Sequence, residues 1–159
     1  MSDLTAPAPH LPALFRPRVA RRWALGIGAL VLAASIVMAV VLPAENSHWS
    51  DRLGFLLFGA VVAWFCHRQA DVQIAATPEG VRVKNLFSTA RFTWPELFAV
   101  SFPEGDPWAH LDLANGDTVA LMALQRADGA YGVAQARAFN ALIARYGTSE
   151  GPASPAEPE

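Results

Sequence analysis

The strongest limit on this fold comes from two uncharged apolar segments in the first half of the chain. The first, from Trp23 to Leu42, has 20 residues without a charge. A helix of that length, rising 1.5 Å per residue, spans the hydrocarbon core of a bilayer. A cleaved signal peptide is the alternative, but its apolar core is shorter, and Leu42 and Ala44 match the small-x-small cleavage site poorly. We therefore predict a retained transmembrane helix over residues 23–42.

The second segment, from Leu53 to Cys66, is only 14 residues long, which taken alone is more typical of a buried core helix. Its charged flanks can extend it, because arginine side chains reach back towards a membrane interface. A helix over residues 49–69 then has membrane-spanning length, with Trp49 and Trp64 placed as in the aromatic belts of membrane proteins. We predict a two-helix transmembrane hairpin with a short external loop over residues 43–48.

Small residues recur at spacings of four on both predicted helices. Ala24 and Gly28 lie on the first helix, and Gly59 and Ala63 lie on the second. Such pairs allow two helix backbones to approach closely in a membrane. Alanine and glycine are also abundant here, which is the alternative explanation. We predict that these four residues form the contact between the helices.

The arginines predict the orientation of this hairpin. Four of them precede the first helix within residues 1–22, a proline-rich segment that we interpret as a flexible basic leader, and Arg68 follows the second helix. The region between the helices, residues 43–52, has two acids and one arginine. Because positive residues favour the cytoplasmic side, we expect a multi-pass protein of the inner (plasma) membrane with both termini in the cytoplasm.

After residue 70 the hydrophobic pattern changes to alternation. Val81 and Val83 face one way, and Arg82 and Lys84 face the other. The Asn-Gly pair at Asn115 predicts a hairpin turn, and further short alternating runs on either side predict a small antiparallel β sandwich or barrel.

An amphipathic helix ends the ordered part of this pattern. Apolar residues at helical spacing form one stripe, and Asp128 is a candidate N-cap before it; the stripe comprises Ala136, Phe139, Leu142, Ile143 and Tyr146. We predict that this face closes the β module. A helix lying on the membrane surface is the alternative, although its polar face has only two arginines. The acidic tail over residues 148–159 has the composition of a disordered segment.

The composition excludes several classes of function. A net charge of −2 argues against nucleic-acid binding, so we expect no nucleic-acid partner. The single cysteine, Cys66, excludes an internal disulfide and a cysteine-based zinc site. The four histidines lie far apart and lack metal-ligand spacing, and His110 with Asp112 has no adjacent nucleophile. We expect no catalytic residues, no metal and no cofactor, and hence no enzyme.

Three basic residues form the candidate binding patch. Arg82, Lys84 and Arg91 are expected on the outward face of two neighbouring strands. Beside an anionic leaflet each base gains about 1 kcal/mol from lipid charge. An ordinary solvated strand face is the alternative.

The order of elements and several short motifs resemble a known family. They are FRPR (15–18), EGVRVKNLFSTARFTWPELFAVSFP (79–103) and AQARAFNALIARYG (134–147). Over residues 16–147 the chain resembles bacterial, in particular actinobacterial, membrane proteins with a PH-like domain, the low molecular weight protein antigen 6 family. This resemblance implies an α+β membrane protein, with a PH-like sandwich over residues 70–147 capped by the C-terminal helix. The first hairpin loop, TPEG (77–80), is acidic, so headgroup binding by basic residues of that loop is not carried over.

These observations favour a membrane-anchored interaction or scaffold module that faces the cytoplasm. Its expected partners are the lipid bilayer and another membrane or cytoplasmic protein. One alternative is a sensor of anionic lipid that uses Arg82, Lys84 and Arg91. The other is an auxiliary subunit of a membrane transport or secretion complex, held by helix–helix contacts.

Overall fold

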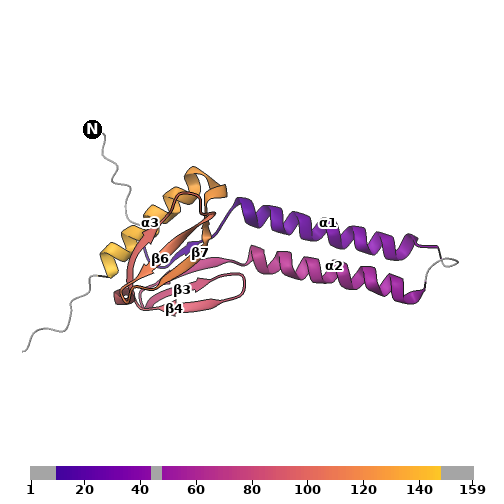
Figure 1. Cartoon of the computed structure of the whole chain (residues 1–159), viewed down its shortest axis with the longest axis horizontal. Coiled ribbons are helices and arrows are strands. Elements are labelled where there is room, and N and C mark those ends of the chain that lie inside the picture. The colour runs from indigo at the N-terminus through magenta and orange to yellow at the C-terminus, as the bar shows by residue number, and fades with distance from the viewer. Residues whose placement is uncertain (1–9, 44–47, 148–159) are drawn as a thin grey trace, which may run out of the picture. The chain divides into compact units, whose positions relative to one another are not determined.

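The computed structural model describes residues 10–43 and 48–147 of the chain (Figure 1). The predicted tail over residues 148–159 and most of the predicted loop over residues 43–48 lie outside them. The chain divides into two compact units. One is Pro17–Val72, and the other combines Met1–Arg16 with Gln73–Glu159.

The unit Pro17–Val72 contains two helices, α1 (Val19–Val41) and α2 (Trp49–Ala70). Both are long and apolar enough to cross a membrane. Helix α1 begins four residues before the predicted start at Trp23, because an apolar run marks only the part of a helix suited to hydrocarbon and arginine is itself a good helix former. Helix α2 matches the predicted range to within one residue.

The other unit is a two-sheet structure closed by a helix. The described residues form one four-stranded antiparallel sheet, ordered β1 (Ala13–Phe15), β2 (Gln73–Thr77), β3 (Gly80–Lys84) and β4 (Thr89–Phe92). A second antiparallel sheet has three strands, ordered β5 (Leu97–Ser101), β6 (Trp108–Leu113) and β7 (Thr118–Gln125). Helix α3 (Ala130–Tyr146) follows the last strand (Figure 1). The α+β fold class is therefore as predicted.

Strand β1 lies inside the range that we assigned to a flexible leader. It pairs with β2 through Ala13 opposite Ala76 and Phe15 opposite Ile74. Phe15 is only 3% exposed, and its ring centroid lies 5.4 Å from that of Phe139 on α3. The segment 13–15 is thus an integral strand of the sheet. Three residues between prolines are too few to show a period, so sequence patterning could not reveal it.

Alternation along the strands places the core as predicted. Ile74, Ala76, Val81 and Val83 are at most 2% exposed, while Arg82 between them is exposed. Helix α3 buries one stripe of side chains, comprising Ala136, Phe139, Leu142 and Ile143. The predicted N-cap at Asp128 is wrong: Gly129 precedes α3, and Asp128 ends a short 3-10 helix, Arg126–Asp128.

The motif G-V-R-V-x-N, residues 80–85, joins the two sheets. Gly80 has φ of 147°, and a Cβ there would collide with the carbonyl oxygen of Phe92. Asn85 is buried, donates from Nδ2 to the carbonyl oxygen of Ala120 at 2.7 Å, and accepts at Oδ1 from the backbone N–H of Met122 at 3.2 Å. Its side chain thereby links the end of β3 to β7 through groups that would otherwise be buried without partners.

The motif W-x-E-L, residues 94–97, turns the chain from β4 into β5. Trp94 is 5% exposed, donates from Nε1 to the carbonyl oxygen of Thr77 at 3.0 Å, and lies 5.2 Å from the ring of Tyr146. Leu97 follows in the core at 5% exposure. This turn therefore holds the first sheet hairpin and the end of α3 together.

Candidate functional site

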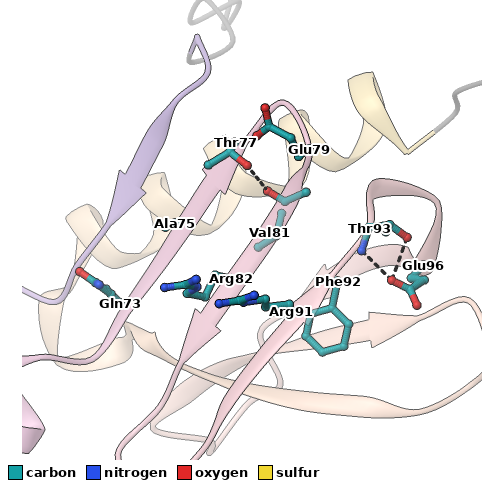
Figure 2. Close-up of a pocket in the computed structure, with 11 residues that line it drawn as sticks. Gln73, Ala75, Thr77, Glu79, Val81, Arg82, Arg91, Phe92, Thr93 and Glu96 are labelled. Atoms are coloured by element: carbon teal, nitrogen blue, oxygen red, sulfur yellow. Dashed lines mark hydrogen bonds between the residues drawn. The ribbon is translucent and has the colours of Figure 1, made fainter.

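The outer face of the four-stranded sheet carries the predicted basic patch. Arg82 on β3 and Arg91 on β4 are directly opposite each other in the strand register. Figure 2 shows their two guanidinium groups side by side. Lys84 lies on the same face, one row away, opposite Thr89. The structure thus brings Arg82 and Arg91 together and leaves Lys84 beside them.

This face is hollowed into an open cavity of about 720 Å³. Arg82 and Arg91 line it, and Lys84 does not. The other lining residues come from β2, from the turn into β3, and from the segment 92–96; they are Gln73, Ala75, Thr77, Glu79, Gly80, Val81, Phe92, Thr93 and Glu96.

Gln73 is held in one orientation at the basic end of the cavity. Arg16, which follows β1, donates from Nε to Oε1 of Gln73 at 2.7 Å, and its Nη2 donates to the same oxygen. Because the guanidinium needs an acceptor, the amide oxygen must face Arg16 and the amide NH₂ group is left as the free donor end. The cavity thus has an amide donor as well as two guanidinium groups.

Two carboxylates line the cavity away from the arginine pair. Glu96 accepts at Oε2 from the backbone N–H of Thr93 at 2.6 Å and from Thr93 Oγ1 at 2.8 Å. These backbone and hydroxyl hydrogen bonds, which form a capping box, lower the pKa of Glu96. The pKa of Glu79 is likewise lowered, by a hydrogen bond from the Thr77 side chain and by one from the backbone of Glu79 itself. Both groups are therefore ionised at neutral pH.

No described side chain neutralises the arginine pair. Within residues 10–43 and 48–147, neither the Arg82 nor the Arg91 side chain makes a hydrogen bond or an ion pair. Like charges placed directly opposite on neighbouring strands destabilise a sheet. The cavity therefore presents a concentrated positive charge that lacks a counter-charge in the described structure.

Of the polar residues that line the cavity, only Arg82 and Arg91 belong to the predicted patch. Gln73 and Thr77 could have been predicted, because the alternation that buries Ile74 and Ala76 also places them on the outer face. Thr93 and Glu96 carry the S/T-x-x-E signature of a capping box. Arg16 belongs to the FRPR motif, but no pattern indicated its contact with Gln73, because that contact depends on the pairing of β1.

The helix pair contains the other predicted contact residues. Ala24, Gly28 and Gly59 are buried in the described structure, and Ala63 is half-buried. A Cβ on Gly28 would lie 2.8 Å from Cys66 Cβ and 3.6 Å from Ala63 Cα.

Gly59 approaches a different part of α1 from the one that its predicted partners occupy. A Cβ there would lie 2.6 Å from Ser35 Cβ and 3.4 Å from Leu32 Cα. The structure thus brings Gly28 against Ala63, and Gly59 against Ser35. Ser35 and Ala39 are also buried, although neither belongs to the predicted contact residues.

No group of three or more histidine, cysteine or carboxylate side chains is arranged to hold a metal ion among residues 10–43 and 48–147. His110 lies on β6, with Nε2 2.9 Å from Asp106 Oδ2.

Comparison with known proteins agrees with this fold. The bacterial PH domain family matches residues 71–140. The uncharacterized proteins Rv1417 of Mycobacterium tuberculosis and Mb1452 of Mycobacterium bovis are each 35% identical to the chain over 94 residues. That alignment spans 59% of this chain and 58% of each relative. No solved structure matches the chain. Residues 71–140 thus match a bacterial PH domain in sequence, and two antiparallel sheets closed by a C-terminal helix are consistent with the resemblance to actinobacterial PH-like proteins.

Proposed function

We propose that this chain is a membrane-anchored interaction module, in which α1 and α2 cross the inner membrane and hold the PH-like domain at its cytoplasmic face. One observation carries this proposal. Strand β1 precedes both helices in the sequence, strand β2 follows them, and the two strands pair with each other. The helices are therefore an insertion between two paired strands of one sheet.

This insertion restricts the topology through chain length alone. Phe15 and Ile74 are paired, and each is four residues from the nearest helix end, at Val19 and Ala70. Four residues reach at most about 14 Å. A single crossing of about 30 Å would put the paired strands on opposite sides of the membrane. Both helices must cross, or neither does.

The same pairing argues against a cleaved signal peptide. Cleavage after α1 would remove β1 and with it Phe15, whose ring is buried against Phe139. Removal of a buried aromatic ring from a domain of this size costs about 3–5 kcal/mol, a large part of a typical total stability. A retained α1 is therefore the arrangement under which the domain keeps its core.

The outer surfaces of the helices suit a bilayer. Many large apolar side chains are more than half exposed on them, including Leu30, Val40, Phe58 and Val61. Soluble proteins rarely expose so much contiguous apolar surface. The four arginines just before and within the first turn of α1 favour the cytoplasmic side for the domain.

Cysteine labelling in intact cells tests this topology. In a Cys66→Ala background, Ser50→Cys places a thiol at the start of α2, and Glu104→Cys places one on an exposed turn of the domain. A membrane-impermeant maleimide should label the first variant in intact cells and the second only after the cells are broken. Labelling of Glu104→Cys in intact cells would contradict the proposal.

The partner of the domain stays a prediction, either another membrane protein or a cytoplasmic one. An auxiliary subunit of a transport or secretion complex would use the exposed apolar faces of α1 and α2. Cys66 is a poor cross-linking probe for such a partner, because it faces Gly28 within the helix pair. Exposed positions such as Leu30 and Val61 are better sites for cross-linking.

A further inference from the structure

The basic end of the cavity has the donors of an anion site. The two guanidinium groups of Arg82 and Arg91 lie side by side (Figure 2), and the free NH₂ end of the Gln73 amide belongs to the same lining. Each guanidinium presents a planar fork of N–H donors that matches two oxygen atoms at once. An anion that accepts from both forks would also remove the repulsion between the two strands that carry them.

The number of acceptor oxygens decides between the common anions. A carboxylate has only two oxygen atoms, which the two guanidinium forks would have to share, and its single charge balances only one of the two arginines. A phosphate monoester has three terminal oxygens and a charge of about −1.5 to −2 at neutral pH, so it can accept from both arginines together. We propose that Arg82 and Arg91, assisted by Gln73, bind the phosphate monoester of a lipid headgroup or of a small soluble compound.

The far end of the cavity limits what else the ligand can carry. Glu79 lies three residues before Arg82, about 10 Å along the strand, and Glu96 also lines the cavity. Both carboxylates are ionised at neutral pH because hydrogen bonds favour their charged forms. They repel a ligand with several phosphates. The site therefore favours one phosphate group whose remaining part is neutral or cationic.

The lipid source rests on the proposed function. Gln73 is three residues beyond Ala70, the last residue of α2, so its Cα lies within about 11 Å of the helix end. If α2 ends at the cytoplasmic interface, the chain length alone keeps Gln73 within that distance of the interface. A soluble phosphate compound needs no such placement, so failure of the membrane topology leaves the anion site itself standing.

Binding to the detergent-purified full chain tests the site with two probes. Isothermal titration calorimetry with inorganic phosphate examines the soluble source. Native mass spectrometry with phosphatidic acid, compared with phosphatidylcholine, examines the lipid source. The test variant is Arg82→Gln combined with Arg91→Gln, and the matched control is Arg137→Gln, which removes an exposed arginine of α3 outside the cavity.

We expect the wild type and Arg137→Gln to bind at least one of the two probes, and the double variant to bind it at least about tenfold more weakly. Binding of phosphatidic acid identifies a headgroup, and binding of inorganic phosphate alone identifies a soluble compound. Without ligand the double variant should melt at the same or a higher temperature than wild type, because two opposed charges are gone. If the double variant melts at a lower temperature than wild type, the binding measurements are repeated with the two single variants, Arg82→Gln and Arg91→Gln. Absence of binding to both probes, or equal binding by the substituted protein, would overturn the proposal.

Discussion

The helix pair and the PH-like domain pack their interiors in opposite ways. The buried positions of α1 and α2 in the described structure are small, and a methyl group added at Gly59 would lie 2.6 Å from Ser35 Cβ. The domain instead buries large side chains, such as Phe139 and Leu142, with no exposed surface. One unit depends on the close approach of two backbones, and the other depends on filled volume.

This difference follows from the surroundings of each unit under the proposed function. In water, burial of apolar area stabilises a fold by roughly 25 cal/mol per Å². Between two helices in lipid that gain is nearly absent, because lipid tails are as apolar as leucine, and close contact takes its place. Substitutions should therefore damage one unit and spare the other, by a different mechanism in each.

The largest expected effect is on the domain core, at a residue that precedes both helices. Phe15→Ala should lower the free energy of unfolding of the domain by about 3–5 kcal/mol, since it empties the space against Phe139. The midpoint of thermal unfolding, followed by fluorescence of buried tryptophan, should fall by more than about 10 °C. Leu14→Ala is the matched control, because Leu14 is in the same strand but 52% exposed. Equal midpoints for the two variants would contradict the assignment of β1 to the core.

A smaller effect is expected in the helix pair. Gly59→Leu inserts a side chain where even a Cβ is too close to Ser35, and overpacking of this kind costs about 1–3 kcal/mol. Spin labels at exposed Leu30 and Val61, in a Cys66→Ala background, should show a broader or longer distance distribution by double electron–electron resonance.

Gly54→Leu is the control on the same helix, since nothing lies within 4 Å of a Cβ at that position. It should leave the distance distribution unchanged. The comparison between the two units would break if Gly59→Leu also lowered the melting temperature of the domain, because a spacing defect between helices should leave a filled core intact.

Sequence patterning could predict those elements in which one period continues for long enough. The apolar runs gave both helices, and alternation gave the inward faces of β2 and β3, where Ile74 and Val83 are buried. Strand β1 has only three residues, and its place depends on a partner far along the chain. The contact between the two helices was predicted only in part for the same reason. Spacing along one helix shows which face carries small residues, but it does not show that Gly59 lies opposite Ser35.

The candidate site divides in the same way. Alternation placed Arg82 and Arg91 on one face, because it acts within each strand. Their direct opposition depends on register, which the turn from Lys84 to Thr89 determines and which patterning does not reveal. The orientation of Gln73 depends on Arg16, and that contact exists only because β1 pairs with β2.

The smallest expected effect concerns the stability of the domain in acid, to which the carboxylate of Glu96 contributes. Hydrogen bonds from Thr93 lower the pKa of Glu96 in the folded chain, so its folded pKa lies below its unfolded value. The stabilisation is therefore fully present above the unfolded pKa, about 4.3, and is lost as the pH falls through the folded pKa. Glu96→Gln should flatten the decline in domain stability at and below that pH, measured by thermal melts between neutral and acidic pH. Glu104→Gln, on an exposed turn, is the matched control and should keep the wild-type slope. If Glu96→Gln kept that slope as well, the capping box would not contribute to the acid sensitivity of the domain.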